Sequence, residues 1–599
     1  MPSYFVDSQG AYCYIKQSTS YWDKEIKKSR SKQICIGKID KETGHITLYP
    51  EFIESSTINS ITIKGQIIDI HSQHNYLKSI NDKYRESIRK GLAKHDDING
   101  DYIESDNRLF EPLTYCPIEI HSFKNFGGSY FIKQIAEQIN LLDILKEVFP
   151  KKWQFILNIV FFLLLENKKM SHCEYFVKNF YSLPNLSMKS QRISDFLDHI
   201  KLQERDKFYK KWINILQEDE FIALDITSIS SESEYLEEVA FGHNKENNKL
   251  KQFNLCMLFG EKSYMPMYQT IYHGSLNDNI TLKNTIIEFS GIIGHYNFKL
   301  VMDRGFYSKE NVEYLLSKKG LKFIVGVPFT TNYAKKLVDS VYDSINNMNN
   351  YIKTSTNGDN IKGMRCYINF ENQNLILPDT DEDTNFNKQN LLSVYVYFNV
   401  NKKMRESNLF CKKLADIKKE ILNNQKININ HKHLVKQFLD IKYSDDQSSI
   451  VNININQKKV DEHLKYCGYS VLLSNDDLDA SKLYITYVKK DVVEKSFHNY
   501  KTYIGLDRPY IHGNKRLLNK SFIMQICQII YCRIHKIMQE KDLYDKFSVP
   551  KLLSILNELK SFSIKDNEFI RPITALQRMI YKKFDIMLPK VDKNNKIIF

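Results

Sequence analysis

Two aspartates, each directly after a short apolar run, are the first residues whose position suggests chemistry. Asp225 follows the run 221–224, and Asp303 follows the run 298–302. In open α/β sheets, side chains at strand ends lie at the rim where ligands bind, and two carboxylates there can hold Mg²⁺ through oxygen atoms. Taken singly, such an aspartate is more often a helix cap or a turn residue, so the interpretation needs a further group.

A third acid lies in segment 487–501, which has helical periodicity. At about 100° per residue, four polar side chains share an arc of roughly 60°: Tyr487, Lys490, Glu494 and Lys501. Val488 and Val492 lie nearly opposite and are expected to face the core. Surface ion pairing is the simpler interpretation, but Glu494 and Lys501 are seven residues apart, beyond i,i+4 reach. A metal-binding carboxylate flanked by groups that bind phosphate explains this face better.

The segments around these acids alternate between strand and helix patterns. Strands are predicted at 254–259, 267–272, 298–302 and 323–327, with helices at 281–291 and 311–319 between them. This order predicts an α/β domain. Later in the chain we expect a strand at 392–400, a basic helix at 401–424 and a strand at 469–473. On the N-terminal side of this α/β domain, we expect strands at 11–15 and 33–39 and a helix at 76–94.

These patterns divide the chain into seven predicted regions. They are an N-terminal β-rich region (1–60), a charged linker (61–127), a helical region (128–220), a first part of the core (221–330), an insertion domain (331–468), a second part of the core with the glutamate helix (469–540) and a C-terminal helical region (541–599). Basic and aromatic residues interleave in 128–220. This pattern fits a DNA-contacting domain and an ordinary helical bundle about equally.

Composition narrows the function classes. The 599 residues include 85 Lys and Arg against 71 Asp and Glu, and this net charge of +14 favours a polyanionic partner. No phosphate-binding G-x-x-x-x-G-K-[ST] motif occurs. The 10 cysteines form no C-x-x-C pair, which argues against a zinc ribbon or disulfide scaffold and suits a reducing cytosol. The apolar stretch 155–165 is far shorter than the roughly 20 residues of a membrane span, so we expect a cytoplasmic protein without a membrane partner.

The acids resemble a known constellation. Asp225, Asp303 and Glu494 resemble the three acids of a DDE transposase, and the glutamate helix resembles the Tyr-x2-Arg-x3-Glu-x6-Lys pattern of the IS-four superfamily of insertion-sequence transposases. Lys490 stands where that pattern has Arg; it keeps the charge but not the two-pronged grip of a guanidinium. Within the superfamily, the IS-sixteen-thirty-four-like branch is most similar, through segments 21–25, 35–38, 225–228, 491–497 and 506–509.

The resemblance implies a fold and an activity. The fold would be an α/β RNase H-like catalytic core, a mixed sheet flanked by helices, split by a β-containing insertion domain and preceded by a small N-terminal β region and a helical domain. The activity would be DNA cleavage at the ends of an insertion sequence and joining of the 3′-OH ends to target DNA by two-metal in-line phosphoryl transfer. Asp225, Asp303 and Glu494 would be catalytic and would hold two Mg²⁺ ions, with Mn²⁺ as a substitute.

The same resemblance implies the partners. Tyr487, Lys490 and Lys501 would bind DNA phosphates. The partner would be double-stranded DNA, both terminal inverted repeats and target, and a homodimer would form on the DNA ends, in the nucleoid of a bacterial cytoplasm. In the superfamily an aromatic side chain can stack on a flipped base, and four candidates stay open: Trp153, Trp212, Tyr235 and Phe241.

Two other functions share these features. An RNase H-like nuclease without strand transfer would carry the same acids, and only its products would distinguish it. A non-catalytic DNA-binding protein derived from a transposase is the second alternative. The presence of all three acids argues against it, because such derivatives often lose one.

Overall fold

The computed structural model describes most of the chain. The described residues are 3–9, 12–23, 28–40, 46–49, 52, 60–63, 66–69, 120–183, 187–216, 219–242, 250–352, 360–370, 374–376, 391–424, 426–428, 431–444, 450–505, 511–564, 567–591 and 597–598. The helix expected at 76–94, most of the linker expected at 61–127 and the family-like segment 506–509 lie outside them.

The chain divides into two compact units, and the smaller one comprises 1–122 with 563–567. Its sheet has the order β1-β2-β3-β4, formed by β1 (Ser3–Gln9), β2 (Tyr12–Asp23), β3 (Lys28–Asp40) and β4 (Ile46–Leu48). All neighbours pair antiparallel, and the expected strands 11–15 and 33–39 fall in β2 and β3. A separate hairpin joins β5 (Ser60–Ile63) to β6 (Gln66–Asp69).

The larger unit, 123–562 with 568–599, is built on a mixed sheet. In the described residues its strand order is β10-β9-β8-β11-β12-β19-β16-β14-β13, with β15 paired to β14. The bounds are β8 (Phe221–Ser230), β9 (Gln252–Gly260), β10 (Pro266–His273), β11 (Lys299–Met302), β12 (Lys322–Val327), β13 (Tyr351–Ile352), β14 (Ile361–Asn369), β15 (Asn374–Ile376), β16 (Leu391–Asn399) and β19 (Tyr469–Ser474). Only the β8–β11 and β11–β12 pairs are parallel.

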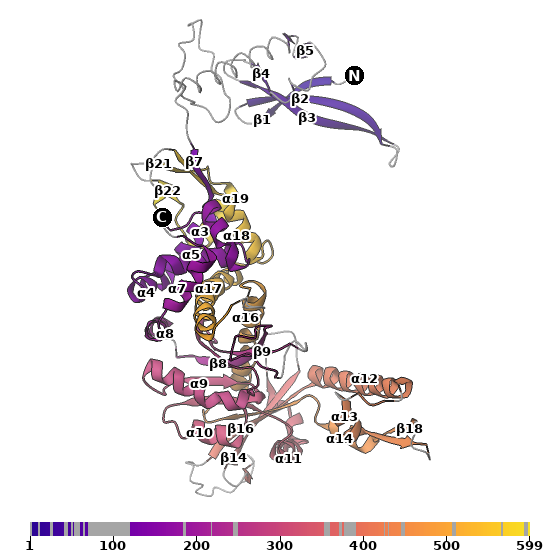
Figure 1. The fold of residues 1–599 in the computed structure, drawn as a ribbon. Coiled ribbons are helices and arrows are strands. Elements are labelled where there is room, and N and C mark those ends of the chain that lie inside the picture. The colour runs from indigo at the N-terminus through magenta and orange to yellow at the C-terminus, as the bar shows by residue number, and fades with distance from the viewer. Residues whose placement is uncertain are drawn as a thin grey trace. The chain divides into compact units, whose positions relative to one another are not determined.

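Helices cover both faces of this sheet (Figure 1). On one side lie α9 (Asp278–Ile293) and α10 (Lys309–Leu316), and on the other α16 (Asp491–Thr502) and α17 (Asn514–Glu540). Two consecutive residues of β10 mark the faces: the Tyr268 hydroxyl donates to Glu288 of α9 at 2.9 Å, whereas the Gln269 amide donates to the Ser521 carbonyl oxygen of α17 at 2.7 Å. The expected fold class is confirmed, because a mixed sheet flanked by helices is consistent with an RNase H-like core.

The helical region before the sheet shares one hydrophobic core with the sheet and with the C-terminal helices. It consists of α3 (Gly127–Gln138), α4 (Leu141–Val148), α5 (Trp153–Leu165), α6 (Cys173–Asn179), α7 (Ser190–His199) and α8 (Leu202–Leu216), and α17 packs against α3, α5 and α7. The C-terminal helices α18 (Val549–Asn557) and α19 (Ala575–Lys583) complete it. In the part of the chain that the structure describes, no helix is long and apolar enough to cross a membrane.

The segment expected to be one insertion domain has two structural roles. Its strands β13 to β16 extend the main sheet. Residues 400–465 instead form a small subdomain from α12 (Val400–Asn424), α13 (Lys432–Phe438), β17 (Leu439–Tyr443), β18 (Ile450–Ile455) and α14 (Gln457–Lys465). This subdomain has its own core: Leu414, Ile417, Ile421, Val435, Phe438, Leu439, Ile450, Ile453 and Val460.

Because the two cores are separate, damage to one should leave the other intact. Phe438 is 1% exposed and packs on Phe410 and His463. We expect Phe438→Ala to cost the subdomain about 3–5 kcal/mol and to raise amide hydrogen exchange in α12, α13 and α14, measured by mass spectrometry. The matched variant Phe522→Ala, in the main core, should raise exchange in α17 and the sheet. Faster exchange of β8 or β9 in Phe438→Ala would contradict two independent cores.

Candidate active site

Asp225 and Asp303 occupy neighbouring positions on two adjacent parallel strands. The β8–β11 ladder ends with Leu224 opposite Met302. Asp225 directly follows Leu224, and Asp303 directly follows Met302. Because neighbouring strands lie about 4.7–4.9 Å apart, the two carboxylates start from adjacent backbone positions. The prediction that Asp225 ends its strand is wrong, since β8 continues to Ser230 by pairing with the antiparallel β9.

Strand register also places Asp225 on the face covered by α16 and α17. Asp225 lies opposite Met257, which lies opposite Gln269. Directly opposed residues point to the same side of a sheet, and Gln269 donates to groups of α16 and α17, Tyr500 at 3.3 Å and Ser521 at 2.7 Å. Asp225 therefore faces the helix that carries Glu494.

The glutamate segment is two helices and not one. α15 (Ala480–Lys489) ends one residue before Lys490, and α16 begins at Asp491. At the junction the Lys490 amide donates to the Tyr487 carbonyl oxygen at 3.3 Å and the Val493 amide to that of Lys490 at 3.0 Å. These i→i−3 bonds tighten the backbone as in a 3₁₀ turn, which often marks a functional position.

This break changes which residues face the core. The prediction for Val488 is wrong, because its side chain is 41% exposed. Val492 is only partly buried against the core. The buried face of α16 consists instead of Val493, Ser496, Phe497 and Tyr500. The prediction assumed one continuous helix at about 100° per residue. The tightened turn at Lys490 rotates α16 relative to α15, so the predicted faces do not hold across the junction.

Three direct contacts tie the glutamate segment to the sheet and to itself. The Tyr487 hydroxyl donates to Asp303 Oδ1 at 3.2 Å. The Lys490 ammonium donates to Glu494 Oε1 at 3.3 Å. At the other end of α16, Lys501 Nζ donates to the Ser228 carbonyl oxygen of β8 at 2.7 Å. Tyr487, Lys490 and Glu494 therefore gather with Asp303, whereas Lys501 lies about two turns farther along the helix.

The Lys490 ammonium is the electrostatic centre of this group. Its side chain is 11% exposed, and burial alone would lower its pKa. The carboxylates of Asp303, Glu494, Asp225 and Asp491 outweigh burial and raise the pKa above the ordinary lysine value. A lysine with a raised pKa is charged throughout the neutral range. All three predicted acids are therefore within electrostatic reach of one buried cation.

The Tyr487 hydroxyl is held in its protonated, donating form. Burial, together with the charge of Asp303 that accepts its hydrogen bond, raises the pKa of Tyr487. Gly326 of β12 makes room for this contact. A Cβ there would lie 2.9 Å from the Tyr487 hydroxyl oxygen and 3.0 Å from the Arg304 backbone nitrogen, so any larger residue would push the tyrosine or the loop after Asp303 aside.

The donor set suits a hard cation. Asp225, Asp303 and Glu494 offer only carboxylate oxygens, the ligands that Mg²⁺ prefers. Together these carboxylates raise the pKa of Lys490, as expected for a site with several negative charges. Within the described ranges, no three Asp, Glu, His or Cys side chains are grouped closely enough to hold one metal ion. The Lys490 ammonium balances the acids in this arrangement.

The four candidate aromatic side chains have different environments. Trp212 is 1% exposed, and its indole N–H donates to the Pro266 carbonyl oxygen at 2.9 Å, so its role is structural. Trp153 is partly buried against the main core. Tyr235 and Phe241 are 73% and 67% exposed. Of the four, only these last two present most of a ring to solvent.

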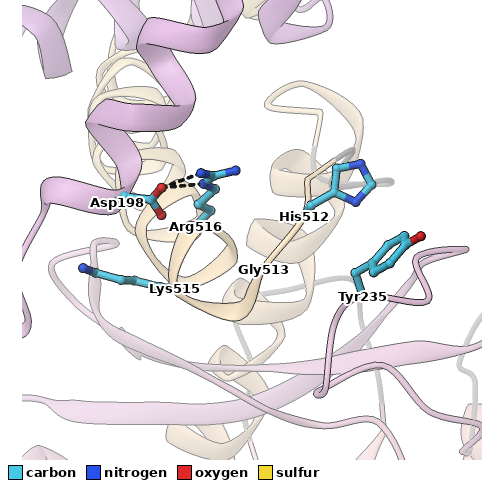
Figure 2. Close-up of a pocket in the computed structure, with 6 residues that line it drawn as sticks. All are labelled: Asp198, Tyr235, His512, Gly513, Lys515 and Arg516. Carbon is cyan, nitrogen blue, oxygen red and sulfur yellow. Dashed lines mark hydrogen bonds and ion pairs between the residues drawn. The ribbon is translucent and has the colours of Figure 1, made fainter.

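Tyr235 borders an open pocket of about 660 Å³ lined by Asp198, Tyr235, His512, Gly513, Lys515 and Arg516. Figure 2 shows Tyr235 and His512 on one side of this pocket and Arg516 directed to Asp198 on the other. The Tyr235 and His512 rings are 5.4 Å apart at 79°, and Arg516 Nε donates to Asp198 Oδ2 at 2.8 Å. The pocket thus combines two aromatic rings with cationic side chains.

A family comparison agrees with this geometry. The model of the family described as "Transposase DDE domain" matches residues 216–530, more than half of the chain. The chain belongs to the transposase DDE domain family. The match spans β8 to most of α17 and so includes all three acids. DNA transposition is the function class of this family, and divalent metal ions are its general cofactors. The match does not select the IS-four superfamily or its branch.

Similarity to other known proteins is low. A cryo-EM structure of the piggyBac transposase synaptic complex with hairpin DNA matches at 11% identity and a TM-score of 0.33, over 67% of this chain and 69% of that one. That score is too low to support a detailed comparison. Curated proteins show no match.

Asp491 is a further carboxylate of the candidate site, and the sequence prediction did not include it. Burial raises the pKa of its carboxyl group; Lys490 opposes that shift, and Glu494 and Asp303 add to it. Asp491 therefore shares the electrostatic surroundings of the three predicted acids. Its position three residues before Glu494, one turn along a helix, was the available signal.

Lys490 should stabilise the folded transposase through these carboxylates. We expect Lys490→Met to lower the free energy of unfolding at pH 7 by about 1–3 kcal/mol, because it leaves charged acceptors without their donor. The loss should shrink as the pH falls through the raised pKa of Asp491, because protonation of Asp491 removes one of the charges that Lys490 balances. Chemical denaturation across the acidic and neutral range measures it, with Lys482→Met, at an exposed position of α15, as the control. A pH-independent loss would contradict the assignment.

Proposed function

We propose that this DDE transposase, of the IS-four superfamily and its IS-sixteen-thirty-four-like branch, cuts DNA at the ends of an insertion sequence and joins the 3′-OH ends to target DNA. The observation that carries the proposal is the adjacency of Asp225 and Asp303 at the end of the β8–β11 ladder, with Lys490 linking them electrostatically to Glu494. Carboxylates on neighbouring strands and on the helix that faces them are donors that can hold the metal ions of metal-assisted phosphoryl transfer.

Asp225, Asp303 and Glu494 would hold two Mg²⁺ ions, which when bound supply activation of the attacking oxygen and stabilisation of the leaving oxygen. In the first step, water attacks the phosphorus at the element end, the bond to the 3′ oxygen breaks, and a 3′-OH and a 5′-phosphate result. In the second step, that 3′-OH attacks a target phosphodiester, forms a new P–O bond and releases a target 3′-OH. No covalent enzyme intermediate is needed.

The chain's own contribution is positioning and charge. Tyr487 orients Asp303 through its hydrogen bond, and Lys490 supplies a fixed positive charge next to all three acids. Lys490 would also bind the phosphate at the cut, and Lys501 would contact the DNA backbone farther along α16. Because Lys490 is a compact point charge where the family pattern has Arg, it neutralises a phosphate without gripping two of its oxygens.

Terminal inverted repeats and target DNA are the proposed duplex partners, and a dimer assembled on two ends would bring both cuts together. The pocket beside Tyr235 supports one further assignment. Its exposed phenol ring lines the same pocket as Lys515 and Arg516, which lie on the opposite side (Figure 2), and an aromatic ring across from cations suits stacking on an unpaired base next to a phosphate. Among the four aromatic candidates we assign this role to Tyr235.

Asp225→Asn provides the test of catalysis. We expect it to reduce Mg²⁺-dependent cleavage and joining at least 100-fold, because a neutral amide oxygen binds Mg²⁺ more weakly than a charged carboxylate. The substrate is a duplex carrying the inverted repeats that flank the gene, and gels resolve nicked from joined products. Asp143→Asn, an exposed residue of α4, should retain wild-type activity. Equal activity of Asp225→Asn and wild type would refute the site, and cleavage without joined products would favour the nuclease.

Stacking on Tyr235 predicts weaker binding of an unpaired base. Loss of one base–aromatic stack costs about 1–3 kcal/mol, so we expect Tyr235→Ala to weaken binding of an element end with an unpaired terminal base by roughly 5- to 150-fold. Fluorescence anisotropy measures it. A fully paired end should bind both proteins alike, and Tyr175→Ala, which removes a 61% exposed tyrosine elsewhere, should change neither. An equal loss with the paired end would contradict stacking.

A further inference from the structure

A line of cations follows the exposed side of α12 in the small subdomain. Arg405, Lys412 and Lys419 recur every seven residues. At about 100° and 1.5 Å per residue, they share an arc of roughly 40° and span roughly 21 Å. All three side chains are exposed. We refer to Arg405, Lys412 and Lys419 as the α12 stripe.

The stripe is opposite the face that holds the subdomain together. Leu414, Ile417 and Ile421 are 4% exposed or less and lie on the far side of the helix. Removing the stripe charges therefore leaves the packed face of α12 unchanged. The fold of the subdomain does not require these cations.

The described residues offer the stripe no ion-pair partner. Ion pairs of the subdomain involve other cations, such as Lys402 with Glu406 and Lys465 with Asp339. Asp416 follows Lys412 by one turn but forms no ion pair with it within the described part of the chain. Three cations in a row that form no ion pair within the described residues favour an external polyanion.

The stripe starts close to the candidate active site. Lys402, in the first turn of α12, donates to the Tyr469 carbonyl oxygen of β19 at 2.8 Å and to the Ser470 hydroxyl at 2.6 Å. Burial lowers the pKa of Lys402, and the charges of Arg304 and Arg405 lower it further, against the opposing effect of Glu406. Arg304 directly follows Asp303, and Arg405 is the first residue of the stripe. Lys402 therefore lies within electrostatic reach both of the loop after Asp303 and of the stripe.

We propose that the α12 stripe binds the phosphate backbone of the duplex that extends away from the cut site. The inference rests on the proposed function, because it takes DNA as the ligand. A duplex carries about one charge per 1.7 Å, so a 21 Å row of three cations matches a continuous backbone and not a small anion. The contact is independent of sequence, since cations on phosphates carry no base readout.

The test is the salt dependence of binding by the full-length protein. Fluorescence anisotropy with an element-end duplex is measured in EDTA across a sodium chloride series. The test variant is Arg405→Gln/Lys412→Gln/Lys419→Gln. Each lost phosphate contact should flatten the slope of log K against log salt by about 0.9, so the triple variant should be flatter by about 2.7. Thermal unfolding checks that the variant is folded.

A charge-matched triple variant controls for net charge. Lys541→Gln/Lys546→Gln/Lys583→Gln removes three exposed cations from the α17–α19 region and should keep the wild-type slope. An unchanged slope in the stripe variant, or equal flattening in both triples, overturns the stripe. Because binding is measured without metal, its outcome is separate from catalysis. A wild type that never cuts element ends would refute the transposase proposal while a flatter stripe slope still upheld the DNA contact.

Discussion

The parallel pairing of β8 with β11 is the constraint on which the site depends. It ends with Leu224 opposite Met302, so the next residues, Asp225 and Asp303, are adjacent without any choice of rotamer. Two carboxylates in that position repel each other. The buried ammonium of Lys490 compensates this repulsion, and the surrounding acids raise its pKa.

The helices that deliver Lys490 are fixed to the sheet at both ends. Tyr487 bonds to Asp303 before the junction, and Lys501 bonds to the Ser228 carbonyl oxygen near the end of α16. Between them, the buried Tyr500 hydroxyl joins Gln269 and Ser521 in a polar network beneath α16. Glu494 contrasts with these anchors, because its side chain is 57% exposed. The site thus combines a fixed frame with one largely exposed carboxylate, which is held by its ion pair with Lys490.

The sequence predicted the elements of the core better than their joins. Periodicity placed β9 to β12, α9, α10 and α12 within a few residues, because each has a clear apolar pattern and a turn signal at its ends. The end of β8 was missed because an aspartate after an apolar run looks like a strand end, while pairing with β9 depends on residues far along the chain. The interruption at Lys490 was missed for the same reason, since one tightened turn leaves no mark in periodicity.

The three acids were predicted from spacing and resemblance and stay a prediction, whereas their surroundings were not predicted. Burial of Trp212 depends on Pro266, and access for Tyr487 depends on Gly326, both contacts across long stretches of sequence. The division of 331–468 was also hidden, because a strand that extends a sheet and a strand in a separate hairpin have the same local pattern. Long-range packing decides these features.

In the described part of the chain, the surroundings of position 490 offer few hydrogen-bond acceptors within reach, which favours lysine over arginine there. A buried guanidinium brings five N–H donors, whereas an ammonium brings three. Within the described residues the Lys490 ammonium makes one hydrogen bond, to Glu494, and it lies 5.4 Å from the centre of the Tyr487 ring. An arginine here would bury more unpaired donors in the absence of DNA, at a cost of about 1–3 kcal/mol for each. Lysine therefore keeps the site stable in the absence of DNA, and in the proposed function its remaining donors would bind the oxygens of a phosphate.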